Sequence, residues 1–417
     1  METLPQPIRR PRADHCISRK NIDRDALSVL YHLSNSGYTA YLVGGGVRDI
    51  LLGRPPKDFD VATNAHPGQI RKLFRNAFLI GRRFRLALIK FGPNKQIEVS
   101  TFRRQPEQED VEDDSRPGAL YQFEDNYFGT PAEDAFRRDF TINGLFYDIR
   151  TFDVIDYVGG LKDLDRKILR CIGDPNIRFR EDPVRMMRAV RFAMRLGFSI
   201  HKDSERAIEK HHSEIQQASK PRLYEEILKL YGHGTTCATF RLLWTTKLMA
   251  DIFQGLYDYV QHSGKKRSPL WDYLREYDAE CDNPAAPEYG LRVAVLLCPL
   301  YMDHVALATK KGKFTAEGVA KEVVESFFVD PLVAKAWRIP RLIVQDAEDM
   351  LSAQVHFDQR DPHMKRSRVF SRVWFEGALL LYKIRMKATG KDTDDTEAWE
   401  RSYAHYKERN PDAETAE

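Results

Sequence analysis

Cysteine is scarce in this chain and forms no recognisable pattern. Five cysteines occur among the 417 residues, and they are scattered: Cys16, Cys171, Cys237, Cys281 and Cys298. There is no Cys-x-x-Cys pair and no set spaced with histidine as zinc ligands. An odd, scattered count is typical of a reducing compartment, and it argues against a disulfide framework and against a zinc site.

Long apolar runs are missing as well. We see no N-terminal signal peptide and no apolar stretch of about 18 residues or more, so the sequence predicts neither secretion nor a membrane span and favours the cytoplasm. The net charge of +4 is close to neutral, which leaves binding of phosphate or nucleic acid to local clusters. The Gly-x-x-x-x-Gly-Lys-Ser/Thr loop of the P-loop ATPases is also absent, and that excludes a phosphate site of this kind.

The most informative segment is a glycine turn between an apolar strand and a short helix. Residues 40–43 read as the strand and residues 47–52 as the helix. Backbone N–H groups of Gly44 and Gly45 can then point at a phosphate beside the helix N-terminus, with Arg48 nearby to bind it. Taken alone, the glycines favour an ordinary strand-turn-helix connection.

Two carboxylates follow this turn. Asp58 and Asp60 flank Phe59 on a predicted strand, so both project from one face while Phe59 turns into the core. Carboxylates on one face can share two Mg²⁺ ions, which activate an attacking hydroxyl and neutralise a leaving pyrophosphate. An Asp-x-Asp alone is more often a solvated strand edge, but beside the glycine turn it indicates nucleotidyl transfer.

This order resembles the opening motif of the nucleotidyltransferase superfamily branch that contains tRNA CCA-adding enzymes and bacterial poly(A) polymerases. Strand 96–103 is similar to the family strand whose carboxylate completes the metal site, and Glu98 is the matching residue. Block 133–143 is similar to the one whose arginines contact the nucleotide phosphates, here Arg137 and Arg138. Within it, Asp134 either assists at the metal ions as a catalytic residue or serves a helix cap or an ion pair.

Block 180–192 is the most discriminating match. Asp182 followed by Pro183 reads as the start of a helix, which puts Asp182 and Arg185 one turn apart on one face. A carboxylate and a guanidinium side by side can hydrogen-bond the edge of a base. The block resembles the family's Glu-Asp-x-x-Arg element, which implies that Asp182 and Arg185 select adenine, with Arg188 in support. The alternative is the solvated stripe of an amphipathic helix.

Two basic segments predict contact with RNA. Residues 79–89, which include Arg82 and Arg83, resemble a segment that marks bacterial poly(A) polymerases, although a basic hairpin edge would look similar. Farther along, Lys365, Arg366 and Arg368 precede aromatic residues, a mixture that suits phosphate contact and base stacking.

The predicted fold class is an α/β nucleotidyltransferase head with a mixed β-sheet and helices, followed by an all-α neck, body and tail. The predicted segments are a basic flexible N-terminus (1–25), the catalytic head (26–157), a helical neck for base recognition (158–220), a helical body (221–350) and a basic RNA-binding tail with an acidic disordered end (351–417). The Gly-Gly turn at 159–160 is either a hinge between head and neck or a plain hairpin turn.

The resemblance implies a poly(A) polymerase that transfers AMP from ATP to RNA 3′ ends without a template. It also implies two Mg²⁺ ions, with Mn²⁺ as an alternative, held by Asp58, Asp60 and Glu98. We expect a cytoplasmic monomer whose partners are RNA 3′ ends, ATP and RNA-decay proteins, with no membrane. Two alternatives stay open. One is a CCA-adding or A-adding tRNA nucleotidyltransferase, and the other is a non-catalytic RNA-binding scaffold, against which the three carboxylates count.

Overall fold

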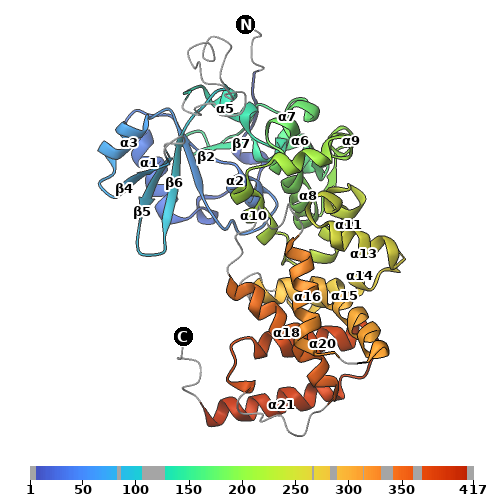
Figure 1. Ribbon diagram of the computed structural model, residues 1–417. Coiled ribbons are helices and arrows are strands. Elements are labelled where there is room, and N and C mark those ends of the chain that lie inside the picture. Colours follow the sequence, from blue (N-terminus) through green and yellow to red (C-terminus); the bar gives the residue numbers. More distant parts are fainter. Residues whose placement is uncertain are drawn as a thin grey trace. The chain divides into compact units, whose positions relative to one another are not determined.

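The computed structural model describes residues 6–81, 86–105, 127–264, 267–281, 289–312, 314–329, 341–359 and 369–410. The chain divides into two compact units (Figure 1). The first comprises Met1–Glu181 with Gly197–Ala207, and the second comprises Asp182–Leu196 with Ile208–Glu417. An α/β unit with a mixed sheet and a helical remainder confirm the predicted fold class.

The first unit is built on one eight-stranded sheet with the strand order β1-β8-β7-β2-β3-β6-β5-β4. Its strands are β1 (Ile8–Arg10), β2 (Ala40–Val43), β3 (Asp60–Thr63), β4 (Ala77–Ile80), β5 (Leu86–Lys90), β6 (Gln96–Thr101), β7 (Leu145–Asp148) and β8 (Val154–Asp156). Strands β3 and β6 run parallel, and the other neighbouring pairs run antiparallel. The two strands that carry Asp60 and Glu98, both predicted metal-site residues, are thus the parallel pair.

One face of the sheet is covered by α1 (Arg24–Asn35) and α3 (Pro67–Leu73), which contact strands β2 to β6. Side chains that alternate onto this face, such as Val61, Val99 and Ala87, are fully buried. Helix α1 begins where the Asp23 carboxylate accepts the N–H groups of the first turn, and it buries an apolar stripe at helical spacing. This packing fixes the sheet and leaves its other face for the site.

The opposite face is closed by a core cluster near β2 and β7. The cluster consists of Val43, Ala62, Phe102, Ala135, Phe146 and Ile155. Ala135 belongs to α5 (Pro131–Arg137), a helix whose N-terminus carries a capping box between Thr130 and Glu133. Farther out on the sheet, Phe78 and Ile80 of β4 remain 53% and 43% exposed. This face is therefore covered at the centre of the sheet and open toward β4.

The remaining elements of the first unit are short. They are η1 (Arg12–Asp14), η2 (Arg19–Asn21), α2 (Gly45–Leu51), η4 (Thr141–Asn143), α6 (Gly160–Asp165), β9 (Ile168–Leu169), α7 (Pro175–Glu181), β10 (Ser199–Ile200) and the start of α9 (Lys202–His211). Strand β10 pairs with β9 in parallel, which returns the chain to this unit after its excursion through residues 182–196.

For residues 6–25, the part that the structure describes, the expectation of a flexible stretch over residues 1–25 is wrong. Strand β1 adds to β8 as an antiparallel edge strand. Arg9 and Arg10 of this strand form ion pairs with Asp153 and Asp165. Backbone pairing along the sheet edge supplies order that the basic composition did not indicate.

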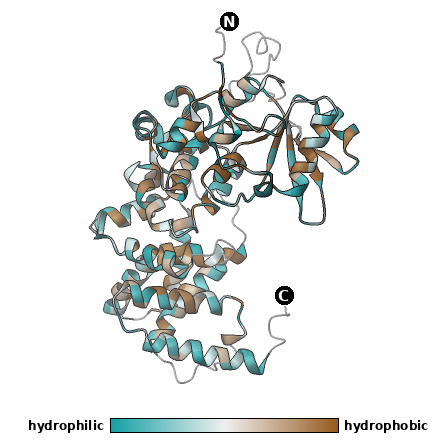
Figure 2. Cartoon of the chain, turned by 180° about the vertical axis from the view of Figure 1, so that it is seen from behind, coloured by the Kyte–Doolittle hydropathy of each residue, from teal (hydrophilic) through white to brown (hydrophobic). Residues whose placement is uncertain are grey.

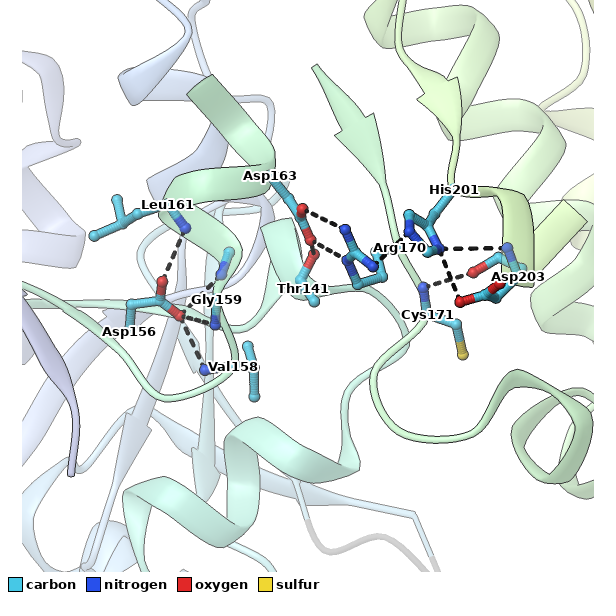
Figure 3. A network of polar contacts seen from close by, with 12 residues as sticks. Thr141, Asp156, Val158, Gly159, Leu161, Asp163, Arg170, Cys171, His201 and Asp203 are labelled. Carbon is cyan, nitrogen blue, oxygen red and sulfur yellow. Dashed lines mark hydrogen bonds and ion pairs between the residues drawn. The ribbon is translucent and has the colours of Figure 1, made fainter. Parts of the chain in front are cut away.

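The junction at residues 156–161 joins strand β8 to helix α6 through residues 157–159, so the hairpin-turn alternative is wrong. The buried carboxylate of Asp156 accepts four backbone N–H groups, from Val158, Gly159, Gly160 and Leu161, at 2.9–3.0 Å (Figure 3). Gly159 adopts a left-handed conformation at φ +82° to allow this. The predicted boundary between residues 157 and 158 falls inside the first unit, since the change of unit comes at residue 182.

A second polar cluster ties α6 to β9 and β10. Asp163 accepts two hydrogen bonds from Arg170, at 2.9 and 3.2 Å, and one from the Thr141 hydroxyl at 2.8 Å. The same guanidinium contacts His201 Nε2 at 2.7 Å (Figure 3). These contacts fasten the returning segment to the block that ends at Asn143.

The described part of the second unit is helical. Its elements are α8 (Val184–Leu196), η5 (His212–Gln217), α10 (Lys220–Leu228), α11 (Thr236–Thr245), α12 (Leu248–Ile252), α13 (Gln254–His262), α14 (Pro269–Glu280), α15 (Tyr289–Lys311), α16 (Ala316–Val329), α18 (Arg341–Gln359), α20 (Phe375–Ala388) and α21 (Asp394–Arg409). In Figure 2 these helices carry both hydrophobic and hydrophilic residues along their lengths, as expected of helices that bury one side.

Helix α15 is long and apolar enough to cross a membrane by length and composition, and it is the one such helix in the described ranges. The sequence had predicted no apolar stretch of this length. Of its apolar window, 56% is buried inside the unit, and the helix packs against α14, α16, α18 and α20. We therefore interpret α15 as a core helix.

The chain end differs from the predicted acidic disordered segment as far as residue 410. Residues from Asp394 form α21, and its Trp399, Tyr403 and Tyr406 pack on the ring of Phe370 with centroids 5.4–6.4 Å apart. The predicted boundary at 350/351 also falls within a helix, α18. The acidic first turn of α21 suits a helix N-terminus, which explains how an acidic stretch can be ordered.

Candidate active site

Two of the three predicted metal-site carboxylates lie side by side. Asp60 begins β3, and Glu98 stands directly opposite it on the parallel strand β6. Asp58 precedes the strand by two residues instead of lying within it. Residues paired in register present their side chains on the same face of a sheet. Asp60 and Glu98 therefore share the face that the central cluster leaves open.

The carboxylates influence one another. Burial raises the pKa of Asp60, and the charge of Asp58 raises it further against an opposing effect of Arg138. Partial burial likewise raises the pKa of Glu98, with added repulsion from Asp60 and Asp58. Crowded, partly desolvated carboxylates are the oxygen donors that a hard divalent cation prefers. The donor set thus fits such an ion, although no three acidic, His or Cys side chains of the described residues converge as a finished metal site.

The glycine turn makes room for arginines. Gly44 has φ +69°, and a Cβ there would lie 2.9 Å from Nη1 of Arg138. Its N–H donates to the carbonyl of Leu145 at 3.1 Å, so the expectation that this N–H binds a phosphate is wrong. Helix α2 begins at the next residue, Gly45. Glycine is thus favoured at position 44 by the left-handed backbone conformation, and the Arg138 guanidinium lies close to it.

Arg48 lies inside the first unit and is 3% exposed. Its guanidinium donates to Asp49 at 2.7–2.8 Å and to the side-chain oxygen of Asn143 at 2.6 Å. Asn143 in turn donates to Asp139 at 3.0 Å. This placement corrects the prediction that Arg48 binds a phosphate directly, because a buried, paired guanidinium positions its neighbours instead. Asn143 is a residue that the sequence reasoning missed.

Arg138 and Asp134 form an ion pair. Two nitrogens of Arg138 donate to Asp134 at 2.9 and 3.2 Å, and the guanidinium lies 5.3 Å from the centre of the Phe146 ring. Asp134 also accepts the backbone N–H of Arg103. Of the two roles considered for Asp134, the structure favours the ion pair over a catalytic one.

Arg137 is the last residue of α5. The buried side chain of Arg178 donates to the carbonyl oxygens of Arg137 and Arg138, at 2.6 and 3.0 Å. It also pairs with Glu181 at 2.8 Å. Arg178 therefore fixes the backbone that carries the two predicted phosphate-binding arginines, and nothing in its local sequence distinguishes it from its exposed neighbours.

The predicted base-recognition residues lie at the start of α8 in the second unit. Helix α8 begins at Val184, and the carbonyl of Asp182 accepts the N–H of Arg185 at 3.0 Å. The side chains of Asp182 and Arg185 approach to 3.8 Å, as the spacing predicts. Asp182 also accepts a hydrogen bond from Arg222 of α10 at 2.7 Å. The sequence reasoning missed Arg222, which is distant along the chain.

Glu226 of α10 holds the rest of α8. It is 4% exposed and pairs with Arg191 at 2.7 Å and with Arg188 at 3.3 Å. Burial acts to raise the pKa of Glu226, but Arg191, Arg188 and Lys229 together outweigh it and hold the pKa below its usual range. Arg188, predicted to support base recognition, is thus bound to this buried carboxylate.

The residues predicted to bind RNA lie outside the described residues. They are Arg82, Arg83, Lys365, Arg366 and Arg368.

A mixed sheet that carries an Asp-x-Asp beside a third carboxylate, with paired arginines nearby, defines a nucleotidyltransferase head. Comparison with known proteins agrees. Residues 40–170 match the family model described as the poly A polymerase head domain, and residues 197–259 match the model described as a probable RNA and SrmB-binding site of polymerase A.

Whole-chain relatives specify the class further. The chain is 49% identical to poly(A) polymerase I of an Escherichia coli strain over 363 residues, which cover 85% of this chain and 77% of the relative. It is 35% identical to a CCA-adding enzyme of Lactobacillus helveticus over 60% of this chain and 62% of that enzyme. The solved CCA-adding enzyme of Bacillus stearothermophilus, in complex with CTP, matches 93% of this chain and 82% of its own at 28% identity, with a TM-score of 0.64. The chain belongs to the poly(A) polymerase family of nucleotidyltransferases.

Proposed function

We propose that the protein transfers AMP from ATP to the 3′ ends of RNA without a template, releases pyrophosphate, and supports RNA turnover. The observation that carries this proposal is the 49% identity to poly(A) polymerase I over most of both chains. The carboxylate row of Asp60 and Glu98, with Asp58 beside it, lies within the matched head segment. A protein that had kept the fold as a scaffold would have no need to keep mutually repelling carboxylates.

Asp58, Asp60 and Glu98 would hold two Mg²⁺ ions, with Mn²⁺ as an alternative. When bound, such ions lower the pKa of an attacking hydroxyl and balance charge on the leaving pyrophosphate. The residues that would hold these ions, Asp58, Asp60 and Glu98, lie in the segment where we place the RNA 3′-hydroxyl and the α-phosphate of ATP. Burial is the largest cause of the raised pKa values of Asp60 and Glu98, and repulsion between the carboxylates adds to it; a bound cation would offset both effects.

The triphosphate would contact Arg137 and Arg138 and the backbone at Gly45. Asp134 sets the direction of the Arg138 guanidinium by its ion pair. Arg48 and Asn143 act one layer behind, since their buried hydrogen bonds join α2 to the turn that follows Arg138. Gly44 serves by admitting Arg138 close to the backbone.

Asp182 and Arg185 would recognise adenine, the acid by accepting from the exocyclic amine and the arginine by donating to a ring nitrogen. Arg222 competes with the base for the Asp182 carboxylate, so it affects how strongly that carboxylate binds the exocyclic amine. Arg188 supports them through Glu226. Each of these residues can be substituted singly to test its part in the preference for adenine.

For the RNA itself, Arg82, Arg83, Lys365, Arg366 and Arg368 remain proposals from the sequence. We further propose a cytoplasmic enzyme that acts as a monomer and meets RNA-decay proteins, in line with the family model for residues 197–259.

The test is product length. Purified protein is incubated with Mg²⁺ and each nucleoside triphosphate in turn, on an unstructured RNA oligomer and on a tRNA lacking its CCA end. Long ladders with ATP on the oligomer are expected, and Asp58→Ala with Asp60→Ala should remove them. Addition confined to tRNA, with CTP then ATP and an early stop, would replace the proposal by CCA addition, the function of the solved relative. No incorporation on either RNA would favour the scaffold.

A further inference from the structure

The open face of the sheet continues from the carboxylates to the sheet edge. Glu98 of β6 stands opposite Leu88 of β5, and Leu88 stands opposite Phe78 of β4. Asp60 stands opposite Glu98 on the other side. Residues directly opposite one another share a face. One row across four strands therefore runs from Asp60 to Phe78.

The outer end of this row is apolar and exposed. Phe78 is 53% exposed and Ile80, two residues along the same strand, is 43% exposed. Leu88 beneath them is nearly buried at 9%. The ammonium group of Lys90 lies 4.9 Å from the centre of the Phe78 ring. We call these four residues, Phe78, Ile80, Leu88 and Lys90, the outer sheet face.

Charge on this part of the chain is segregated. Between Asp60 and Glu98 the sequence holds eight lysines and arginines and no aspartate or glutamate. Lys95, one of the eight, is neutralised by Asp23 and Asp25 at 2.5–2.8 Å. Lys90 forms no ion pair with any carboxylate of the described residues. A basic segment with an exposed ring suits an anionic polymer that carries planar groups.

We infer that the outer sheet face is a binding platform for single-stranded RNA, on which a base upstream of the 3′ end stacks on Phe78 while Lys90 contacts a phosphate. This inference rests on the proposed function, since it takes the RNA 3′ end to lie at Asp60 and Glu98. Phe78 is two strands from Glu98, a separation of about 10 Å at the usual strand spacing of about 4.8 Å. At about 3.4 Å per nucleotide along a stacked strand, that separation points to the third or fourth nucleotide from the end.

The exposure of Phe78 on the edge strand β4 is explained by a stacking role. Unpaired edges with large apolar side chains invite pairing with other chains, and proteins usually blunt them with charge. Here the Lys90 ammonium group lies over one face of the Phe78 ring and brings a positive charge to it. The other face of the ring is left for a base. A stacked base uses both features.

The experiment measures RNA binding by fluorescence anisotropy, with oligomers that end in a 3′-deoxy nucleotide. Phe78→Ala should weaken binding about five- to tenfold, toward the lower end of what stacking of one base contributes. Phe78→Tyr keeps a ring and should restore binding. Lys90→Gln should reduce the magnitude of the slope of log affinity against log salt by about 0.7, the value for one phosphate contact on a single strand. The matched controls Leu307→Ala and Lys310→Gln, both exposed on α15, should change neither quantity.

An abasic scan locates the contact. Removing the base of the third or the fourth nucleotide should weaken binding to the wild type and have no further effect on Phe78→Ala. A dinucleotide primer, too short to reach Phe78, should be extended equally by both proteins, which separates this inference from the proposed function. Equal RNA binding by wild type and Phe78→Ala, with the same abasic profile, would overturn the platform even where adenylation persists. Absence of adenylation by the wild type on every primer would instead overturn the proposed function.

Discussion

Glu226 offers the sharpest test of how α8, the helix that follows Asp182 and carries Arg185 of the proposed base-recognition pair, is held. Its carboxylate is 4% exposed and pairs with Arg191, itself 8% exposed, and with Arg188. Glu226→Gln keeps the shape of the side chain but leaves a buried guanidinium without its counter-charge. Removing one partner of a buried ion pair costs about 3–5 kcal/mol. We expect the free energy of unfolding of the second unit to fall by that amount.

The assay can isolate this unit. All five tryptophans of the chain lie in the second unit, so urea unfolding followed by tryptophan fluorescence reports on it. Thermal unfolding followed by the same fluorescence gives a second measure. A unit of this size shifts its midpoint temperature by about 2–4 °C per kcal/mol, so the midpoint should fall by about 6–20 °C. Selectivity for ATP over CTP should fall in parallel, since Arg188 is released.

The dependence on pH carries a second signature. The pKa of Glu226 is held below its usual range, so the stability it contributes is fully present above the unfolded pKa of about 4.3 and is lost as pH falls through the depressed folded value. Glu226→Gln should lack this acid-side loss. The matched control is Glu225→Gln, an exposed neighbour on the same helix. Equal stability of the Glu226→Gln and Glu225→Gln proteins would refute the reasoning.

Three further outcomes are expected. Asp156→Ala should lower the free energy of unfolding of the first unit by about 2–4 kcal/mol, because four backbone donors lose their acceptor. Urea unfolding with far-UV circular dichroism measures this loss, and a value near zero would contradict a stabilising role for these four hydrogen bonds. Asp60→Asn should reduce adenylation to background yet stabilise the metal-free protein at pH 7. The pKa values of Asp60 and Glu98 are raised, so metal-free stability should decline as pH rises from the ordinary carboxyl range through the raised values, and Asp60→Asn should flatten that decline in a urea series. Trp399→Ala should cost about 2–4 kcal/mol by opening the cluster that holds α21, and unchanged protection of α21 amides in hydrogen exchange would count against it.

Features that depend on neighbouring residues could be predicted from the sequence. The strand before Gly44, the strand of Glu98 and the proximity of Asp182 to Arg185 all follow from local periodicity and spacing, and each is present in the structure. The order of the chain end could have been predicted too, since Trp399, Tyr403 and Tyr406 recur at helical spacing. The acidic composition of residues 392–395 outweighed that signal.

Residues that act through distant partners could not be predicted. Arg178 reaches back 40 and 41 positions to the carbonyls it holds, and Arg222 reaches 40 positions to Asp182. A single sequence contains nothing that distinguishes these arginines from unpaired ones, because what selects them is the position of the acceptor and, for Arg178, burial. For the same reason Arg48 was assigned to a phosphate, when its acceptor Asn143 lies 95 positions away.

The sheet links the covered and open parts of the site. Closing the whole face would bury more apolar area and stabilise the first unit, since Phe78 and Ile80 are left exposed. Yet the same face carries Asp60 and Glu98, whose raised pKa values indicate that they already lack full hydration. A helix laid across the row would exclude both nucleotide and RNA from them. The core cluster around Phe102 therefore ends where the carboxylates begin, and the exposed residues beyond them form the surface on which we propose that the RNA lies.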